Sequence, residues 1–92
     1  MGPFLCLHFM NYYLYIIYSA SLDQYYVGSS ANLEDRLFRH NNSGSKATKK
    51  AKDWTLKYTE TFATRAQAVR REQEIKKKKS RKYIESLISP VG

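Results

Sequence analysis

Seven consecutive aromatic and aliphatic residues, 12–18, constrain the fold of this chain more than any other stretch. Because the run contains no polar alternation, it is typical of a strand covered on both faces, which places it at the centre of a small sheet. The small and polar residues 19–24 favour a turn, and residues 25–28 form a second short apolar run. Together these segments predict a β-hairpin.

A third strand is predicted over residues 54–62, which show the clearest two-residue period in the chain. Trp54, Leu56, Tyr58, Glu60 and Phe62 fall on one side of such a strand and the intervening Thr and Lys residues on the other. The pattern therefore predicts a half-exposed strand that presents these five side chains on a single face.

Three helices are predicted from their starting residues. Asn32 is a suitable N-cap for a helix that residues 41–45 break, and acidic residues follow it in the first turn, where they suit the helix dipole. Thr64 and Gln67 form a capping box for a helix over residues 65–79, and Ser80 caps a last helix over residues 81–87. The predicted fold class is α+β, a small three-stranded antiparallel sheet flanked by helices.

The positive charge indicates the class of partner. Lys and Arg number 16 against 8 acidic residues, a formal net charge of +8 at pH 7, and 14 of the 16 lie in residues 46–82. A balance of this kind is typical of a phosphate-binding surface, although a solubilising role is the alternative. With 92 residues the chain forms one domain. We expect residues 1–9 to be an N-terminal extension, 10–89 the domain and 90–92 a tail.

The lone Cys6 cannot form an internal disulfide, which predicts a reducing, cytoplasmic location. The apolar start of the chain lacks a basic region and a small-residue cleavage site, and it is too short to span a bilayer. No membrane partner is therefore expected.

Several short motifs occur in a fixed order. Tyr13-Leu14-Tyr15 is followed by Tyr26-Val27-Gly28, then by Arg36 and His40 four residues apart on one helical face, and later by Glu72. This ordered set resembles the GIY-YIG nuclease superfamily, in particular its small stand-alone members related to the nuclease module of the bacterial excision-repair endonuclease. The resemblance covers nearly the whole chain and implies the same α+β fold.

The resemblance also implies a function, the hydrolysis of phosphodiester bonds in DNA with one divalent ion, Mg²⁺ or Mn²⁺. Tyr26 is similar to the family's general base, with Tyr15 beside it and His40 as an alternative base. Arg36 would hold the scissile phosphate, and Glu72 would be the single protein ligand of the metal. Without the resemblance, the tyrosines would be interpreted as core packing and Glu72 as a surface ion-pair residue. Glu74 is the competing carboxylate.

The basic residues nearest these motifs are the expected contacts to nucleic acid. They are Arg36, Arg39, Lys46, Lys49, Lys50, Arg71, Lys76 and Lys77. DNA is favoured over RNA as the partner. Recognition of nucleic-acid structure is favoured over recognition of base sequence, because the domain shows no added specificity element. DNA repair is the implied setting, and a protein partner for targeting and the oligomeric state stay open.

Two departures from the family pattern support an alternative. Tyr13 stands where the first motif has glycine, and Ser29 stands where the excision-repair relatives carry lysine. The alternative function is a nucleic-acid-binding module that does not cleave, or a nuclease subunit that requires a partner.

Overall fold

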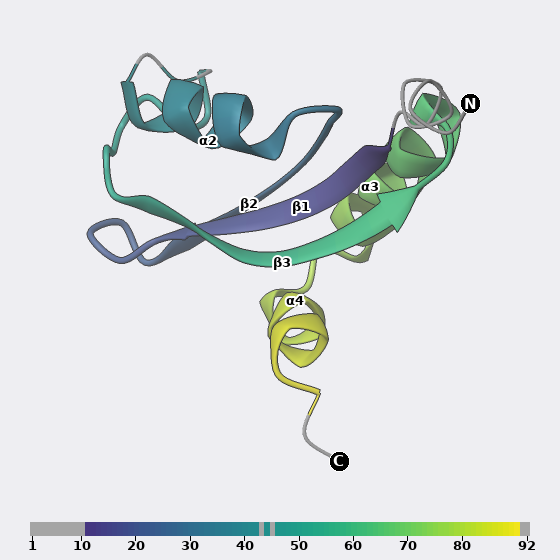
Figure 1. Cartoon of the computed structure of the whole chain (residues 1–92). Helices are drawn as coiled ribbons and strands as arrows, with labels where there is room; N and C mark the ends of the chain where they lie inside the picture. The colour runs from purple at the N-terminus through teal and green to yellow at the C-terminus, as the bar shows by residue number, and fades with distance from the viewer. Residues whose placement is uncertain (1–10, 43, 45, 91–92) are drawn as a thin grey trace.

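One antiparallel sheet in the order β2-β1-β3 organises the residues that this computed structural model describes, 11–42, 44 and 46–90 (Figure 1). The strands are β1 (Tyr12–Ser19), β2 (Gln24–Ser30) and β3 (Trp54–Phe62). The predicted hairpin and the central position of residues 12–18 are confirmed, with Tyr15 opposite Gly28 in the β1–β2 register. β2 and β3 are the two edges of the sheet, and both pair with β1.

The three helices begin where their caps predict. They are α2 (Leu33–Asn42), α3 (Arg65–Lys78) and α4 (Arg81–Ile88). Asn32 accepts a hydrogen bond from the Asp35 amide at 3.0 Å, and Thr64 and Gln67 complete the capping box. α2 runs two residues further than the predicted break, because Asn41 is still helical. The predicted α+β fold class is confirmed.

The sheet separates two small cores, because successive side chains of β1 point to opposite faces. Leu14 and Ile16 pack with Val27 and Ile75 beneath α3 and α4, whereas Tyr15 and Ile17 lie on the face that α2 covers. Figure 1 shows α2 on one side of the sheet and α4 on the other. Alternate residues of β1 therefore point toward α2, and the residues between them point toward α3 and α4.

A β-bulge in β3 corrects one prediction. Ile16 lies opposite Tyr58 whereas Ile17 lies opposite Leu56, so Lys57 is an extra residue in β3. The expectation that residues 54–62 present one continuous face is therefore wrong. Trp54 packs into the core beneath α2, and Tyr58 packs on the opposite face. The bulge lets one edge strand contribute an aromatic ring to each core.

The predicted N-terminal extension, residues 1–9, lies outside the described residues, as do residues 91–92 of the predicted tail. Within the part of the chain that the structure describes, every helix is too short or too polar to cross a membrane.

Candidate active site

A buried tyrosine–histidine pair forms the centre of the site. Tyr15 lies on the α2 face of β1. His40 lies near the end of α2, where its position three residues after Leu37, which packs on the same core as Tyr15, directs it toward the sheet. The hydroxyl of Tyr15 lies 2.8 Å from Nε2 of His40, and the two side chains are 3% and 4% exposed. Exclusion of water from this pair makes the hydrogen bond a fixed part of the site.

The segment after α2 holds the other nitrogen of His40. Oγ1 of Thr48, which is fully buried, lies 2.7 Å from Nδ1 of His40, and the Thr48 carbonyl accepts a 2.9 Å hydrogen bond from the Trp54 indole. Thr48 is a residue of this cluster that the sequence did not reveal, because one threonine inside a lysine-rich turn produces no periodic signal. Its burial fixes a turn on which the predicted contacts Lys46, Lys49 and Lys50 are exposed.

Asn41 secures the same region to the sheet. Its side-chain amide donates to the Trp54 carbonyl at 3.0 Å and accepts from the Trp54 amide at 2.7 Å. Through these two hydrogen bonds the side chain of Asn41 pairs with the backbone of Trp54, the first residue of β3. The bonds position the last turn of α2, and with it His40.

Gly28 brings the Tyr15 ring close to the β2 backbone. A Cβ at residue 28 would lie 2.5 Å from the Tyr15 hydroxyl oxygen and 2.6 Å from its Cζ, so any side chain would displace the ring. With that space empty, the Tyr15 ring centroid lies 6.5 Å from that of Tyr26 and 5.9 Å from that of His40. Tyr26 is itself 5.0 Å from His40, so the three rings form one cluster.

Glu72 approaches this cluster from α3. One carboxylate oxygen accepts a 2.7 Å hydrogen bond from the Ser29 hydroxyl, and the other lies 2.6 Å from Nζ of Lys76. The same ammonium lies 5.6 Å from the centroid of the Tyr26 ring. Lys76 therefore connects the carboxylate to the aromatic cluster across the outer edge of β2. Glu72 is only 15% exposed, and its orientation is fixed at both oxygens.

Burial and neighbouring charges shift the pKa values of Tyr15 and His40 in opposite directions. Burial raises the pKa of Tyr15 well above its usual value; the charges of Tyr26 and Glu72 add to this, and that of Arg36 opposes it. Burial, followed by the positive charge of Arg36, lowers the pKa of His40. At neutral pH Tyr15 is therefore a phenol and His40 a neutral imidazole.

The structure thus brings four predicted residues within electrostatic or hydrogen-bonding reach of Tyr15: Tyr26, Arg36, His40 and Glu72. With Tyr15 they come from β1, β2, α2 and α3, and Arg36 is exposed at the surface of the cluster. Glu74, the competing carboxylate, is 56% exposed and pairs with Arg71. It therefore lies away from the rings.

Three of the predicted nucleic-acid contacts lie apart from the cluster. The Arg71 guanidinium donates to both carboxylate oxygens of Glu60, at 2.9 and 3.1 Å, and it is only 21% exposed. Arg39 pairs with Asp35 on the exposed face of α2, and Lys77 is exposed on α3. Arg71 therefore has a structural role in joining α3 to β3.

Glu72 fits the implied role of a single metal ligand. Among the described residues, no group of three or more His, Cys, Asp and Glu side chains forms a ready-made metal cage. Mg²⁺ needs no such cage, because it keeps several waters and accepts one carboxylate together with substrate oxygens. The Lys76 ammonium beside Glu72 shows that the carboxylate already attracts a cation at one oxygen.

Tyrosine, histidine, arginine and one carboxylate thus lie together at one side of a three-stranded sheet in an α+β domain, and these are residue types that can act on a phosphodiester. The chain belongs to the GIY-YIG family of nucleases: the model of the GIY-YIG catalytic domain matches residues 11–84. Its substrate is accordingly a nucleic acid.

Within that family the chain is similar to UPF0213 proteins. It is 37% identical over 67 residues to one from Staphylococcus saprophyticus, covering 72% of this chain and 80% of the relative. It is 35% identical over 81 residues to one from Bacillus pumilus, covering 84% of this chain and 82% of the relative. The NMR solution structure of a UPF0213 protein from Bacillus halodurans superposes with a TM-score of 0.54 at 31% identity, covering 90% of this chain and 87% of that one.

Proposed function

We propose that this protein is an endonuclease that hydrolyses phosphodiester bonds in DNA with the help of one divalent ion, Mg²⁺ or Mn²⁺. The observation that carries the proposal is the convergence of Tyr15, Tyr26, Arg36, His40 and Glu72 at the outer edge of β2. Hydrolysis requires deprotonation of a water, a polarised phosphate and a stabilised leaving oxygen, and these residue types supply those roles.

Tyr26 is the proposed general base. Of the three candidates, Tyr15 has a raised pKa, and both ring nitrogens of His40 already have partners. Tyr26 is only half-buried, so solvent can reach it, and the Lys76 ammonium lies 5.6 Å from the centroid of its ring. Tyr15 and His40 then act as a fixed pair that positions Tyr26 and the attacking water.

Arg36 and Glu72 both act on the phosphate. The Arg36 side chain is exposed, so it is free to make a charge-assisted contact with a phosphate oxygen. Glu72 would hold the metal through the oxygen that now faces Lys76, and Ser29 would keep the carboxylate oriented. When bound, the metal supplies Lewis-acid stabilisation of the developing negative charge.

The setting of the reaction follows from the same proposal. We infer recognition of DNA structure, with phosphate contacts from Arg36 and from the exposed lysines of the turn after α2. DNA repair in the cytoplasm is the proposed context, and a protein partner would supply targeting.

The test is a cleavage assay with labelled duplex, branched and single-stranded DNA and with RNA. Each substrate is incubated with Mg²⁺, with Mn²⁺ or with a chelator. Cleavage should require the metal and should be lost in Tyr26→Phe and Glu72→Gln. Glu74→Gln is the matched control, because it removes the same charge two residues along α3, and it should keep full activity. Full cleavage by Glu72→Gln would refute the metal role.

The second candidate function is a binding module that does not cleave. Lys76 favours it, because its ammonium occupies one oxygen of Glu72 and competes with a metal ion. Binding of any substrate with no metal-dependent cleavage by the unmodified protein would select this function.

A further inference from the structure

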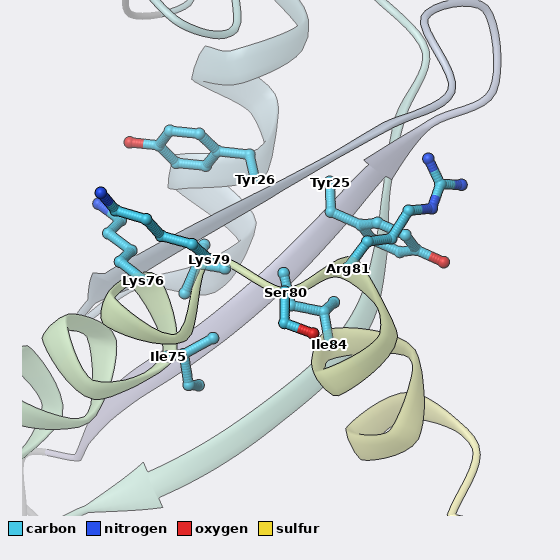
Figure 2. A pocket seen from close by; sticks show the side chains of 9 residues that line it. Tyr25, Tyr26, Ile75, Lys76, Lys79, Ser80, Arg81 and Ile84 are labelled. Carbon is cyan, nitrogen blue, oxygen red and sulfur yellow. The ribbon is translucent and has the colours of Figure 1, made fainter.

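A groove runs beside the cluster along the outer edge of β2. Its volume is about 360 Å³, and it lies between β2 and the junction of α3 with α4 (Figure 2). Ile84 and the rings of Tyr25 and Tyr26 contribute its accessible apolar surface, and the buried Val27 and Ile75 lie beneath them. The edge of β2 that faces away from β1 is open here, since β2 has β1 as its one neighbour in the described sheet.

The lining of the groove carries positive charge and no carboxylate. Lys76, Lys79 and Arg81 are its charged residues. Arg81 is held by Asp23 and by a glutamate of its own helix, so its charge is largely balanced. Lys79 ends α3 in a left-handed conformation, φ 48°, and no carboxylate of the described residues pairs with its ammonium. Lys79 is therefore available to an incoming anion.

The groove and the candidate active site share two residues. Tyr26 and Lys76 line the groove, and both also contact the cluster. In Figure 2 the side chains of Lys76 and Lys79 extend in the same direction, toward Tyr26. A strand whose phosphate is bound between Arg36 and Glu72 would therefore continue past Tyr26 into this groove.

We propose that the groove binds one unpaired nucleotide of the strand next to the scissile phosphate. Lys76 and Lys79 contact its phosphate, and the base and sugar rest on Ile84 and on the rings of Tyr25 and Tyr26. A positive rim over apolar and aromatic surface is the arrangement by which proteins hold single strands. A volume of about 360 Å³ is near the lower limit for a ligand site, which suits one nucleotide.

This inference rests on the proposed function, because it places the groove beside the scissile phosphate. It narrows the substrate class to DNA with a single-stranded segment at the cleavage point, such as a branch or a tail. Blunt duplex presents its bases already paired, so they cannot reach the apolar surface.

The experiment measures binding in the presence of a chelator, so that its result does not depend on cleavage. Fluorescence anisotropy is recorded for a single-stranded oligonucleotide, a blunt duplex and the same duplex with an unpaired tail, over a range of salt concentrations. The proteins are the unmodified chain, Lys79→Gln and the control Lys82→Gln. Both variants lose one exposed lysine charge, and Lys82 does not line the groove. Thermal melts establish that both variants are folded.

We expect the tailed duplex to bind more tightly than the blunt one. For the single strand, the slope of log K against log[salt] should be smaller by about 0.7 in Lys79→Gln, the effect of one lost phosphate contact. Lys82→Gln should keep the unmodified slope. An unchanged slope in Lys79→Gln, or equal binding of blunt and tailed duplex, would refute the proposal that the groove binds an unpaired nucleotide. If the protein cleaves DNA but the slope of Lys79→Gln is unchanged, only the nucleotide-binding role of the groove is refuted. If the slopes are as expected but no substrate is cleaved, only the proposed nuclease activity is refuted.

Discussion

Replacement of Gly28 by alanine tests whether the close approach of β2 to Tyr15 builds the site. The new Cβ would lie 2.5 Å from the Tyr15 hydroxyl oxygen and 2.6 Å from Cζ, so the ring must move. Overpacking of this kind costs about 1–3 kcal/mol. Loss of the 2.8 Å bond to His40 would leave a buried nitrogen unpaired, at a further cost of about 1–3 kcal/mol. The expected loss of stability is therefore about 2–6 kcal/mol.

A loss of that size is a large fraction of the ~5–15 kcal/mol that stabilises a typical domain. Urea denaturation of Gly28→Ala measures it directly, and the same substitution in a Tyr15→Leu background removes the ring that the Cβ would meet. If the clash is with Tyr15, the cost of Gly28→Ala should fall below ~1 kcal/mol in that background. Equal costs in the two backgrounds would refute the reasoning.

Three further predictions concern the same region. Because burial and Arg36 lower the pKa of His40, the stability it contributes is present above about pH 6.5 and is lost as the pH falls through the folded pKa. Thermal melts at about pH 7.5 and about pH 5 should therefore differ, and the difference should shrink in His40→Gln. Thr48→Val should lower the free energy of unfolding by ~1–3 kcal/mol in urea denaturation and should slow cleavage, because it removes the hydroxyl beside His40. Thr48→Ser, which keeps the hydroxyl, should have nearly the stability and the cleavage rate of the unmodified protein. Unchanged stability in Thr48→Val would contradict the buried contact. Asn41→Ala should lower the free energy of unfolding, followed by Trp54 fluorescence in urea, by ~1–3 kcal/mol. An unchanged free energy would show that its two hydrogen bonds to the backbone are replaced by bonds to water.

The elements of the fold could be predicted because they depend on neighbouring residues. The unbroken apolar run of β1 indicated a strand with both faces covered, and β1 is the central strand. Asn32, Thr64 and Ser80 each satisfy the first amides of a helix, a local interaction that the sequence displays directly. The resemblance to the GIY-YIG family implied that Tyr15, Tyr26 and His40 belong to one site, and in the structure their three rings lie within 6.5 Å of one another, centroid to centroid.

Other features depend on packing between distant segments and gave no local signal. Arg71 was expected at the nucleic-acid surface, yet its partner Glu60 lies on another element, and the pair forms only when α3 packs over β3. The bulge at Lys57 is equally hidden, because a strict two-residue period is compatible with a regular strand. Thr48 becomes important only through the fold of the turn that surrounds it.

The bulge in β3 also has a consequence for self-association. β3 is an edge strand, and a regular exposed edge is a template on which a second copy of the chain could add a strand. The extra residue interrupts the row of outward amides and carbonyls, and it places the charged Lys57 at that position. A neighbouring chain that paired with β3 would have to match the irregular spacing and bury the lysine. The bulge that places Trp54 and Tyr58 in different cores thereby also protects the edge of β3 from aggregation.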